Sequence, residues 1–214
     1  MKTDTADAHW NDQWANIEAG SKWLTPEPDV TAWAEAFAPG SRVLDLGAGV
    51  GRHALWIAER GHQVTALDAA PEGLVEIARF GSVETVEARM HALPFDDASF
   101  DHVLSWNVIY HGDEDILLRT IAEIRRVLKP GGTYLGTMLS KRRLPYEQAK
   151  AEGNEISQNT WVFDSPETDK VHPHYYCSAA ELVALFSGFE VIALRDQEHE
   201  RPGSYHWHLT LERL

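Results

Sequence analysis

The sequence predicts an α/β protein in which helices cover both faces of a seven-stranded, mostly parallel sheet whose last strand is antiparallel. From residue 42 onward, short apolar segments alternate with amphipathic segments of helical period, a pattern typical of a parallel sheet wrapped by helices. The chain has 214 residues, which suits one α/β domain with one core. Its 43% hydrophobic and 24% charged residues are typical of a globular protein in water. We therefore expect a single domain over residues 1–214.

A helical cap is expected before the sheet, in residues 1–39. Residues 9–20 place Trp10 and Trp14 on one helical face, and a second short helix is expected at 30–37. Indole rings of such a cap either pack its core or stack on a substrate. Packing is the commoner use, and Trp14 is kept as a candidate substrate residue.

The core of the domain is expected in residues 40–139, followed by an insertion. Its expected strands are 42–46, 63–68, 83–88, 100–106 and 133–139, and its expected helices are 50–60, 71–80 and 113–128. Residues 140–177 are polar, aromatic and uneven, and are too long for a simple connection, so we expect a lid or a substrate-side insertion there. Residues 178–214 are expected to form a helix that begins with a Ser178/Glu181 capping box, and then two strands that pair antiparallel, near 189–195 and 205–211.

Charge and composition exclude several classes of partner. The formal net charge is −14, and such a field repels phosphate backbones and anionic lipid, so nucleic acid is not an expected partner. No apolar run is long enough to cross a bilayer, and the first residues show no secretory pattern, so we expect a cytoplasmic protein. Either a monomer or a homodimer is expected. The single cysteine, Cys177, excludes an intramolecular disulfide and multi-cysteine metal sites, and we interpret it as a buried thiol.

A glycine-rich turn between two acidic residues points to a bound nucleoside. Gly47, Gly49 and Gly51 follow a predicted strand and precede a helix, and Asp68 lies about twenty residues further on. The position after Gly51 is a bulky arginine, which does not suit a nicotinamide dinucleotide. Asp45 stands two residues before the first glycine, where it would repel a pyrophosphate but attract an ammonium or a sulfonium. The motif therefore favours S-adenosylmethionine.

Four segments taken in order resemble the class I S-adenosylmethionine-dependent methyltransferases. They are "VLDLGAGVGRHALWIA", "VTALDAAPEGL", "ALPFDDASFDHVLSWNVIYH" and "IRRVLKPGGTYL", and together they cover about half of the chain. The resemblance implies a Rossmann-like fold with S-adenosylmethionine as the cofactor. A narrower resemblance, through "NVIYHGD" and "HPHYYC", is to small-molecule members such as the tellurite-resistance-type methyltransferases.

The resemblance also implies a cofactor site. The glycines would turn under the methionine moiety, Asp45 would order that end, and Asp68 would accept bonds from the ribose hydroxyls, with a structural helix-capping role as its alternative. Met90 would pack on adenine, although Arg89 stands where the family often has an acidic residue. The full set of expected cofactor residues is Asp45, Gly47, Ala48, Gly49, Gly51, Asp68, Ala69, Met90, His91, Trp106 and Asn107.

The residues after the fourth predicted strand are expected to face the transferred methyl group, because ligands bind beyond the carboxyl ends of parallel strands. Methyl transfer from a sulfonium is an in-line displacement, in which a base is needed for a protonated acceptor but not for a soft anion. Tyr110 and His111 are the expected catalytic residues, with His111 as the candidate base or, alternatively, a structural histidine in a loop.

A second cluster of aromatic and imidazole side chains is expected to line the acceptor pocket. His172, His174 and Tyr175 lie in the insertion, just before the last helix. Together with His206 and His208 they suggest a metal site as an alternative, but histidines that alternate on a strand more often pack, and we expect no metal.

These patterns predict methyl transfer to a small-molecule acceptor. Two alternatives stay open: a protein methyltransferase whose insertion grips a peptide, and a cofactor-binding regulator without catalysis.

Overall fold

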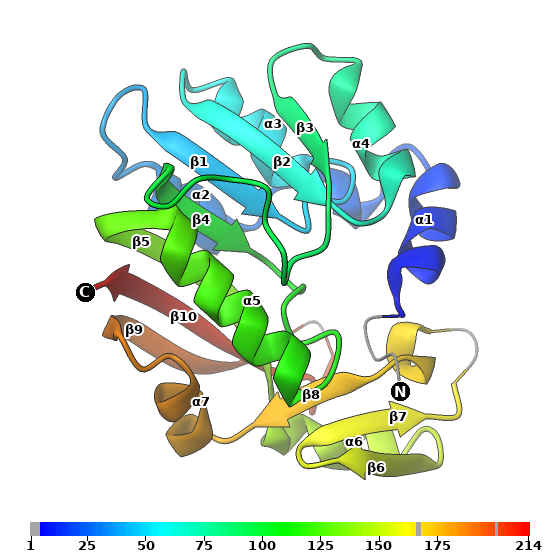
Figure 1. Ribbon diagram of the computed structural model, residues 1–214. Coiled ribbons are helices and arrows are strands. Elements are labelled where there is room, and N and C mark those ends of the chain that lie inside the picture. Colours follow the sequence, from blue (N-terminus) through cyan, green and yellow to red (C-terminus); the bar gives the residue numbers. More distant parts are fainter. Residues whose placement is uncertain (1–4, 166–167, 200) are drawn as a thin grey trace.

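A computed structural model describes residues 5–165, 168–199 and 201–214 and contains the predicted mixed sheet. Seven strands form its central part in the order β3-β2-β1-β4-β5-β10-β9 (Figure 1). Only β10 runs antiparallel to its neighbours β5 and β9, as predicted for the last strand. Their bounds are β1 Arg42–Leu46, β2 Gln63–Asp68, β3 Glu84–Glu87, β4 Phe100–Ser105, β5 Leu128–Ser140, β9 Phe189–Glu198 and β10 Tyr205–Arg213.

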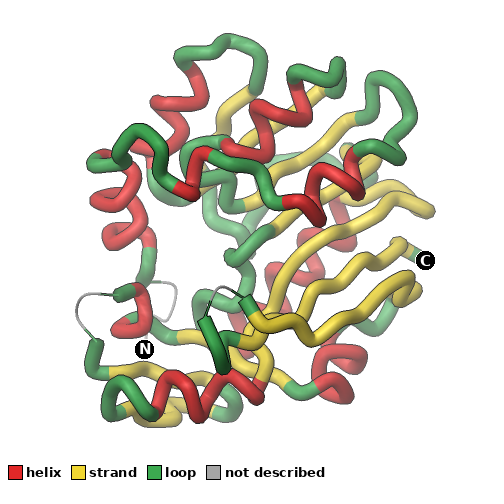
Figure 2. The backbone as a smooth tube through the Cα atoms, turned by 180° about the vertical axis from the view of Figure 1, so that it is seen from behind, coloured by secondary structure: helices red, strands yellow, loops and turns green. Residues whose placement is uncertain are grey.

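Helices cover both faces of this sheet. On one face, α5 (Glu114–Val127) and α7 (Ala179–Leu185) pack on β4, β5 and β10, and α5 crosses in front of the sheet in Figure 1. On the other face, which Figure 2 turns toward the viewer, buried apolar residues of three helices pack on β1, β2 and β4: α2 (Pro28–Ala34), α3 (Arg52–Ala58) and α4 (Pro71–Ala78). The capping box predicted at Ser178 and Glu181 is present at the start of α7.

The parallel register brings the strand ends that carry the predicted motifs to one edge of the sheet. Val43 of β1 pairs with Val64 of β2 and with His102 of β4. Strands β1, β2 and β4 therefore end side by side, and the loops that follow them meet there. Strand β1 is almost entirely apolar and buried after its first residue, so it fixes the position of the glycine turn that follows it.

The structure corrects the predicted strand number, because the sheet formed by the described residues has ten strands rather than seven. The three further strands lie in the segment 140–177, which the sequence analysis treated as irregular. They are β6 (Gly153–Ser157), β7 (Thr160–Phe163) and β8 (His174–Cys177), and a short helix α6 (Leu144–Gln148) precedes them. These strands are short, and β6 is polar and largely exposed, so the segment lacks the alternation that identifies a strand.

Several element bounds also differ from prediction. Helix α1 spans Asp7–Ala15 and ends five residues earlier than expected. Helix α7 ends at Leu185 because Phe186 leaves the helical conformation and Gly188 has φ +99°. Among the helices of the described residues, none combines the length and the apolar character that a bilayer crossing requires.

The predicted N-terminal cap packs directly on the glycine turn. Trp10 and Trp14 of α1 stack with ring centroids 5.2 Å apart, and Trp23 meets Trp14 edge-on at 5.7 Å. Trp14 is buried against Val50 of the turn. Trp33 lies elsewhere, packed with Phe37 on the face that carries α2. Three of the four N-terminal tryptophans therefore form the wall of a site at the strand ends.

Candidate active site

The glycine turn after β1 requires residues without side chains. Gly47, Gly49 and Gly51 all have positive φ, at +75°, +54° and +81°. A Cβ on Gly47 would lie 2.4 Å from the Val108 side chain, and one on Gly49 would lie 2.8 Å from the Trp14 ring. The turn therefore needs glycine both for its backbone conformation and for the close approach of two neighbouring segments.

Asp68, at the end of β2, holds the turn in place. Its carboxylate accepts hydrogen bonds from the backbone N–H groups of Gly49 and Ala70, each at 2.8 Å. Burial raises the pKa of Asp68 above its ordinary value, while these backbone donors act in the opposite direction. Each carboxylate oxygen has a second lone pair, so the same group has acceptor capacity left for ligand hydroxyls.

Asp45 is a buried carboxyl with an unused oxygen. It is 1% exposed, and no hydrogen-bond partner for its Oδ2 is found among the described residues. Burial raises the pKa of Asp45 to about 7, against the opposing effect of Arg52. A buried polar atom without a partner carries a substantial desolvation cost, which is typical of an atom that meets a ligand.

Two small cavities adjoin the turn and contain most of the predicted cofactor residues. The Met90 cavity, of about 90 Å³, is lined by Gly47, Asp68, Ala69, Met90 and His91, among others. The Trp14 cavity, of about 100 Å³, is lined by Ala48, Gly49, Trp14, Trp106 and Asn107, among others, and shares Gly47 and Asp68 with the first. Of the predicted cofactor residues, Asp45 and Gly51 do not line either of these two cavities.

Arg89, the departure from the family pattern, has a partner in the N-terminal cap. Its guanidinium forms an ion pair with Asp7 of α1 at 2.6 Å, and both residues line the Met90 cavity. An acidic side chain therefore does reach this cavity, but from α1 rather than from the segment after β3. The pair joins the cap to the segment that holds Met90.

Arg52, the residue that does not suit a nicotinamide dinucleotide, also ties the N-terminal segment to the turn. Its Nη1 pairs with Glu27 Oε1 at 2.9 Å, and its guanidinium lies 5.1 Å from the centroid of the Trp23 ring. The bulky side chain thus extends away from the glycines and holds residues 22–27 over the site.

A larger cavity of about 550 Å³ lies beside the first two. We call it the Arg143 cavity. Trp10 lines all three cavities, and Asn107 lines both the Trp14 cavity and the Arg143 cavity. Its other walls come from the insertion, from the segment before α2 and from the end of the chain, and include Arg143, Glu147, Asp169, Lys170, Ser204 and His206.

The predicted acceptor residues lie near this cavity but do not line it. Trp14 lines the Trp14 cavity instead, because it covers Gly49. His172 Nδ1 forms a hydrogen bond with Thr5 Oγ1 at 3.0 Å. The Tyr175 hydroxyl forms hydrogen bonds with the side chains of Asn159 and Glu114. His174 is fully buried. Strand β8 buries His174 and Tyr175 outside the lining of the cavity, and the sequence of this segment has no clear period from which to predict that.

The two predicted catalytic residues lie at the junction of the cavities. Tyr110 lines the Arg143 cavity, and burial raises its pKa far above the ordinary value, so its hydroxyl keeps its proton at neutral pH. His111 lines the Met90 and Trp14 cavities. Both ring nitrogens of His111 are already engaged: Nδ1 lies 2.6 Å from Val108 O and Nε2 lies 3.2 Å from Asp169 Oδ2. His111 does not line the Arg143 cavity, so neither of its nitrogens is placed to remove a proton from an acceptor held there.

The histidines of β10 do not join those of the insertion. His208 Nδ1 bonds Asp29 Oδ2 at 2.7 Å, on the α2 side. His206 lines the Arg143 cavity, where Arg143 Nη1 lies 3.2 Å from its Nε2. Burial lowers the pKa of His206 far below its ordinary value, so its ring is neutral. Of the insertion's histidines, His174 meets His111 through Asp169, whereas the two β10 histidines contact His199.

Comparison with known proteins identifies this type of site. Residues 43–132 match the family model described as a methyltransferase domain. Residues 43–132 are therefore a methyltransferase domain, which confirms the predicted resemblance to the class I S-adenosylmethionine-dependent methyltransferases. The matched segment runs from β1 through the glycine turn and Asp68 to the start of β5, so it contains every predicted cofactor residue of this methyltransferase.

Relatives of the methyltransferase act on different acceptors according to their names. A probable tRNA methyltransferase 9B of Bos taurus is 36% identical over 176 residues, which are 75% of this chain and 38% of the relative. A ubiquinone biosynthesis O-methyltransferase of Xanthomonas campestris is 38% identical over 114 residues, 49% of this chain and 46% of the relative. The chain therefore spans less than half the length of these two relatives.

A solved structure shares the fold over almost the whole chain. It is the 1,6-didemethyltoxoflavin-N1-methyltransferase of Burkholderia thailandensis with bound 1,6-didemethyltoxoflavin and S-adenosylhomocysteine. The TM-score is 0.70 at 20% identity, and the match covers 98% of this chain and 84% of that one. At this identity the likeness supports the fold of the methyltransferase and not its acceptor.

The residues present fit the family's cofactor, S-adenosylmethionine. The unpartnered Asp45 Oδ2 suits a cationic group, since a buried carboxylate is stabilised by a positive charge. Asp68 lines both small cavities and has acceptor capacity for two hydroxyls. Met90 offers an apolar, polarizable surface for a flat ring.

Proposed function

We propose that this methyltransferase transfers the methyl group of S-adenosylmethionine to a small acidic molecule held in the Arg143 cavity. The observation that carries the proposal is the position of this cavity, which meets the Trp14 cavity at Trp10 and Asn107. Its volume of about 550 Å³ lies within the range of about 300–1,000 Å³ typical of small-molecule sites.

The charge of the cavity lining favours an acidic acceptor. Its described residues include six basic side chains, Lys22, Arg52, Arg143, Lys150, Lys170 and Arg201, against three acidic ones, Glu27, Glu147 and Asp169. The chain as a whole has a net charge of −14, so the lining reverses the sign of the surrounding field. Positive charge focused in a cleft raises the local concentration of an anionic ligand.

Neither Tyr110 nor His111 is placed to act as a base toward the acceptor, which agrees with an acceptor that enters the cavity as an anion. The cofactor supplies an activated methyl group, because the positively charged sulfur leaves as the neutral thioether of S-adenosylhomocysteine. The chain must align the acceptor and exclude water. Tyr110 keeps its proton and His111 does not line this cavity, so neither is placed to remove a proton from an acceptor there. An acceptor that is already anionic needs no base.

Isotope transfer tests the proposal against its alternatives. The protein is incubated with methyl-labelled S-adenosylmethionine and, in parallel, with a metabolite extract fractionated by charge, with bulk tRNA and with a protein extract. We expect label in the anionic small-molecule fraction. Label confined to tRNA, as the relatives named for tRNA would suggest, or confined to polypeptide would overturn the small-molecule acceptor. Cofactor binding without transfer to any fraction would favour the regulatory alternative.

Replacing Arg143 by glutamine should weaken acceptor binding without affecting the cofactor. Arg143 donates to Ser204 Oγ and pairs with Glu147, and it lines the cavity. Loss of one charged donor of this kind costs about 1.5–3 kcal/mol, so we expect the KM for the acceptor to rise about 10- to 100-fold. The matched control is Arg142→Gln, because the neighbouring Arg142 is 59% exposed and pairs with Asp196 instead. Equal KM values for the two variants would exclude Arg143 from acceptor binding.

A further inference from the structure

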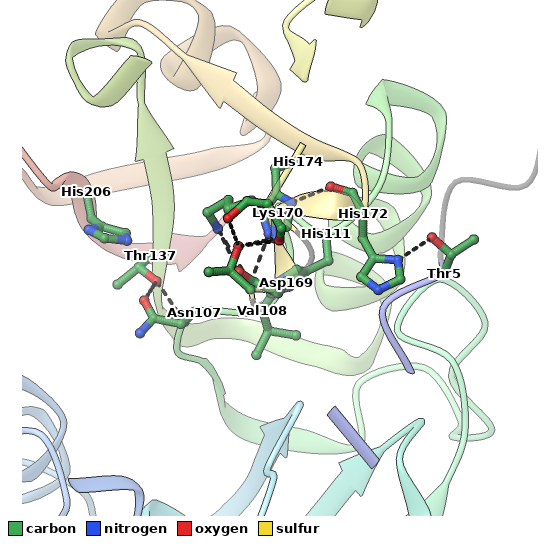
Figure 3. A network of polar contacts seen from close by, with 12 residues as sticks. Thr5, Asn107, Val108, His111, Thr137, Asp169, Lys170, His172, His174 and His206 are labelled. Atoms are coloured by element: carbon green, nitrogen blue, oxygen red, sulfur yellow. Dashed lines mark hydrogen bonds and ion pairs between the residues drawn. The ribbon is translucent and has the colours of Figure 1, made fainter. Parts of the chain in front are cut away.

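Three potential metal ligands meet at the junction of the cofactor and acceptor cavities. His111 comes from the loop after β4, Asp169 from the short 3₁₀ helix Asp169–Val171, and His174 from the start of β8. Asp169 Oδ2 lies 3.2 Å from His111 Nε2 and 3.1 Å from His174 Nε2 (Figure 3). A bridge between His111 and His174 places β8 beside the loop after β4.

The backbone fixes the proton on the other nitrogen of each ring. His111 Nδ1 lies 2.6 Å from Val108 O, and His174 Nδ1 lies 2.7 Å from the carbonyl oxygen of His172. A carbonyl oxygen can only accept a hydrogen bond, so each Nδ1 must carry a hydrogen. In a neutral imidazole with its hydrogen on Nδ1, the Nε2 atom carries a lone pair and can bind a metal.

With both rings neutral, this assignment leaves three electron-rich atoms directed at one point. Two imidazole lone pairs and a carboxylate oxygen repel each other unless a cation lies between them. A histidine that donates Nδ1–H to a backbone carbonyl and presents Nε2 is also the arrangement found around metal-ligating histidines. We propose that His111, Asp169 and His174 bind a divalent first-row transition-metal ion, of which Zn²⁺ is the simplest probe.

The distances suit such an ion. Ligands at about 2.0–2.1 Å from a tetrahedral Zn²⁺ lie about 3.3 Å from each other. The two Nε2 to Oδ2 distances, 3.1 and 3.2 Å, are close to this value, and the three ligand atoms all lie within 4.8 Å of one another. Two histidines and one carboxylate are a ligand set of Zn²⁺ and Fe²⁺ sites that keep open positions for other ligands.

Lys170 stands next to this cluster and contacts both oxygens of Asp169. Its Nζ lies 3.3 Å from Oδ1 and donates a hydrogen bond to Oδ2 at 3.5 Å. When Oδ2 binds the ion, the ammonium must pair with Oδ1 instead, and its positive charge lowers the affinity of the site. Figure 3 shows Lys170 beside Asp169 and the two histidines.

The site would be reachable from the cavities. The His111 and Asp169 side chains are 12% and 18% exposed, whereas His174 is fully buried. Asp169 lines the Arg143 cavity and His111 lines the Trp14 cavity. An ion held here would lie between the acceptor and the cofactor, where its open positions suit an anionic acceptor atom.

Metal binding by the full chain tests the proposal without reference to methyl transfer. Chelator-treated protein is dialysed against Zn²⁺ and, separately, against Co²⁺, and bound metal is counted by elemental analysis. We expect about one ion per chain, with Co²⁺ giving a visible absorption band typical of low coordination number with nitrogen ligands. The absence of a bound ion at Zn²⁺ concentrations of about 0.1 mM would overturn the proposal.

Variants assign the ion to these residues. Asp169→Asn keeps the side-chain shape and His111→Gln keeps a polar group, and each should weaken Zn²⁺ binding about 100-fold or more. His172→Ala is the matched control, because it removes a histidine of the same segment whose Nδ1 bonds Thr5 while the carbonyl that holds His174 remains. We expect it to bind Zn²⁺ as the original chain does. Zn²⁺ should raise the melting temperature of the original chain and of His172→Ala only. Retention of the ion by Asp169→Asn and His111→Gln would contradict the assignment.

Discussion

Replacing Asp45 by asparagine should stabilise the ligand-free protein at pH 8 and weaken its binding of S-adenosylmethionine. Burial raises the pKa of this carboxyl from 3.8 to about 7 in the folded chain. The unfolded chain loses the proton near pH 4, whereas the folded chain keeps it until about pH 7. Stability contributed by the protonated form is therefore full below pH 4 and is lost as the pH rises through 7.

At pH 8 the buried charge opposes folding by up to about 4 kcal/mol, and asparagine removes this cost. Urea unfolding between pH 5 and 8 measures the difference between the two proteins, which should grow with pH. Asparagine also removes the charge that faces a cationic ligand, so calorimetric titration should show cofactor affinity about 10- to 100-fold lower.

Asp101→Asn is the control for Asp45. Asp101 is a carboxyl of the same sheet, but it lies at the opposite strand ends, where it accepts from Arg42 N and pairs with Lys129. These partners lower its pKa despite partial desolvation, so its removal should reduce stability at neutral pH and leave cofactor affinity unchanged. An Asp45→Asn protein that is no more stable than the original at pH 8 would contradict the account of Asp45.

Replacing Asp68 by alanine should remove most of the cofactor affinity. In the proposed complex this carboxylate accepts two charge-assisted hydrogen bonds from ribose hydroxyls, each worth about 1.5–3 kcal/mol. Alanine also leaves the N–H groups of Gly49 and Ala70 without their acceptor, so the turn loses its anchor to β2. We expect S-adenosylhomocysteine to bind at least about 100-fold more weakly, as measured by calorimetric titration.

Asp68→Asn separates the two effects of Asp68. Asparagine keeps one acceptor oxygen at the same place, so the affinity should fall between those of the original chain and of the alanine variant. Asp101→Asn is again the control, because loss of the Asp101 carboxylate should leave the affinity for S-adenosylhomocysteine unchanged. An alanine variant that binds S-adenosylhomocysteine within about threefold of the original would exclude the ribose role of Asp68.

The cofactor side of the site could be predicted from sequence because its residues are close together in the chain and follow the order of a known family motif. Asp45, the three glycines and Asp68 lie within 24 residues on consecutive elements, so β1, the turn and β2 fix their relative positions. Most of the central strands were predictable because their short apolar segments alternate along the chain with helical segments. Strands β6, β7 and β8 were not, because they are short and β6 is mostly exposed.

The acceptor side could not be predicted in the same way. The Arg143 cavity takes its walls from segments near residues 22–28, 143–151, 163–170 and 199–206, which share no period or motif. The basic residues 141–143 were interpreted as a solvated loop, and no motif in the sequence singles out Asp169 as a functional residue. The sequence suggested His111 and His174 separately, but only the pairing of β8 with the loop after β4 shows that they meet.

The central claim is that the glycine turn, Asp45 and Asp68 hold S-adenosylmethionine with its methyl group directed at the Arg143 cavity. A crystal structure of the protein with S-adenosylhomocysteine tests this most directly. The account predicts ribose hydroxyls on Asp68, the amino group at Asp45 Oδ2, adenine against Met90 and the sulfur facing Asn107 and Trp10. A cofactor bound elsewhere, or bound with Asp45 Oδ2 still without a partner, would contradict it.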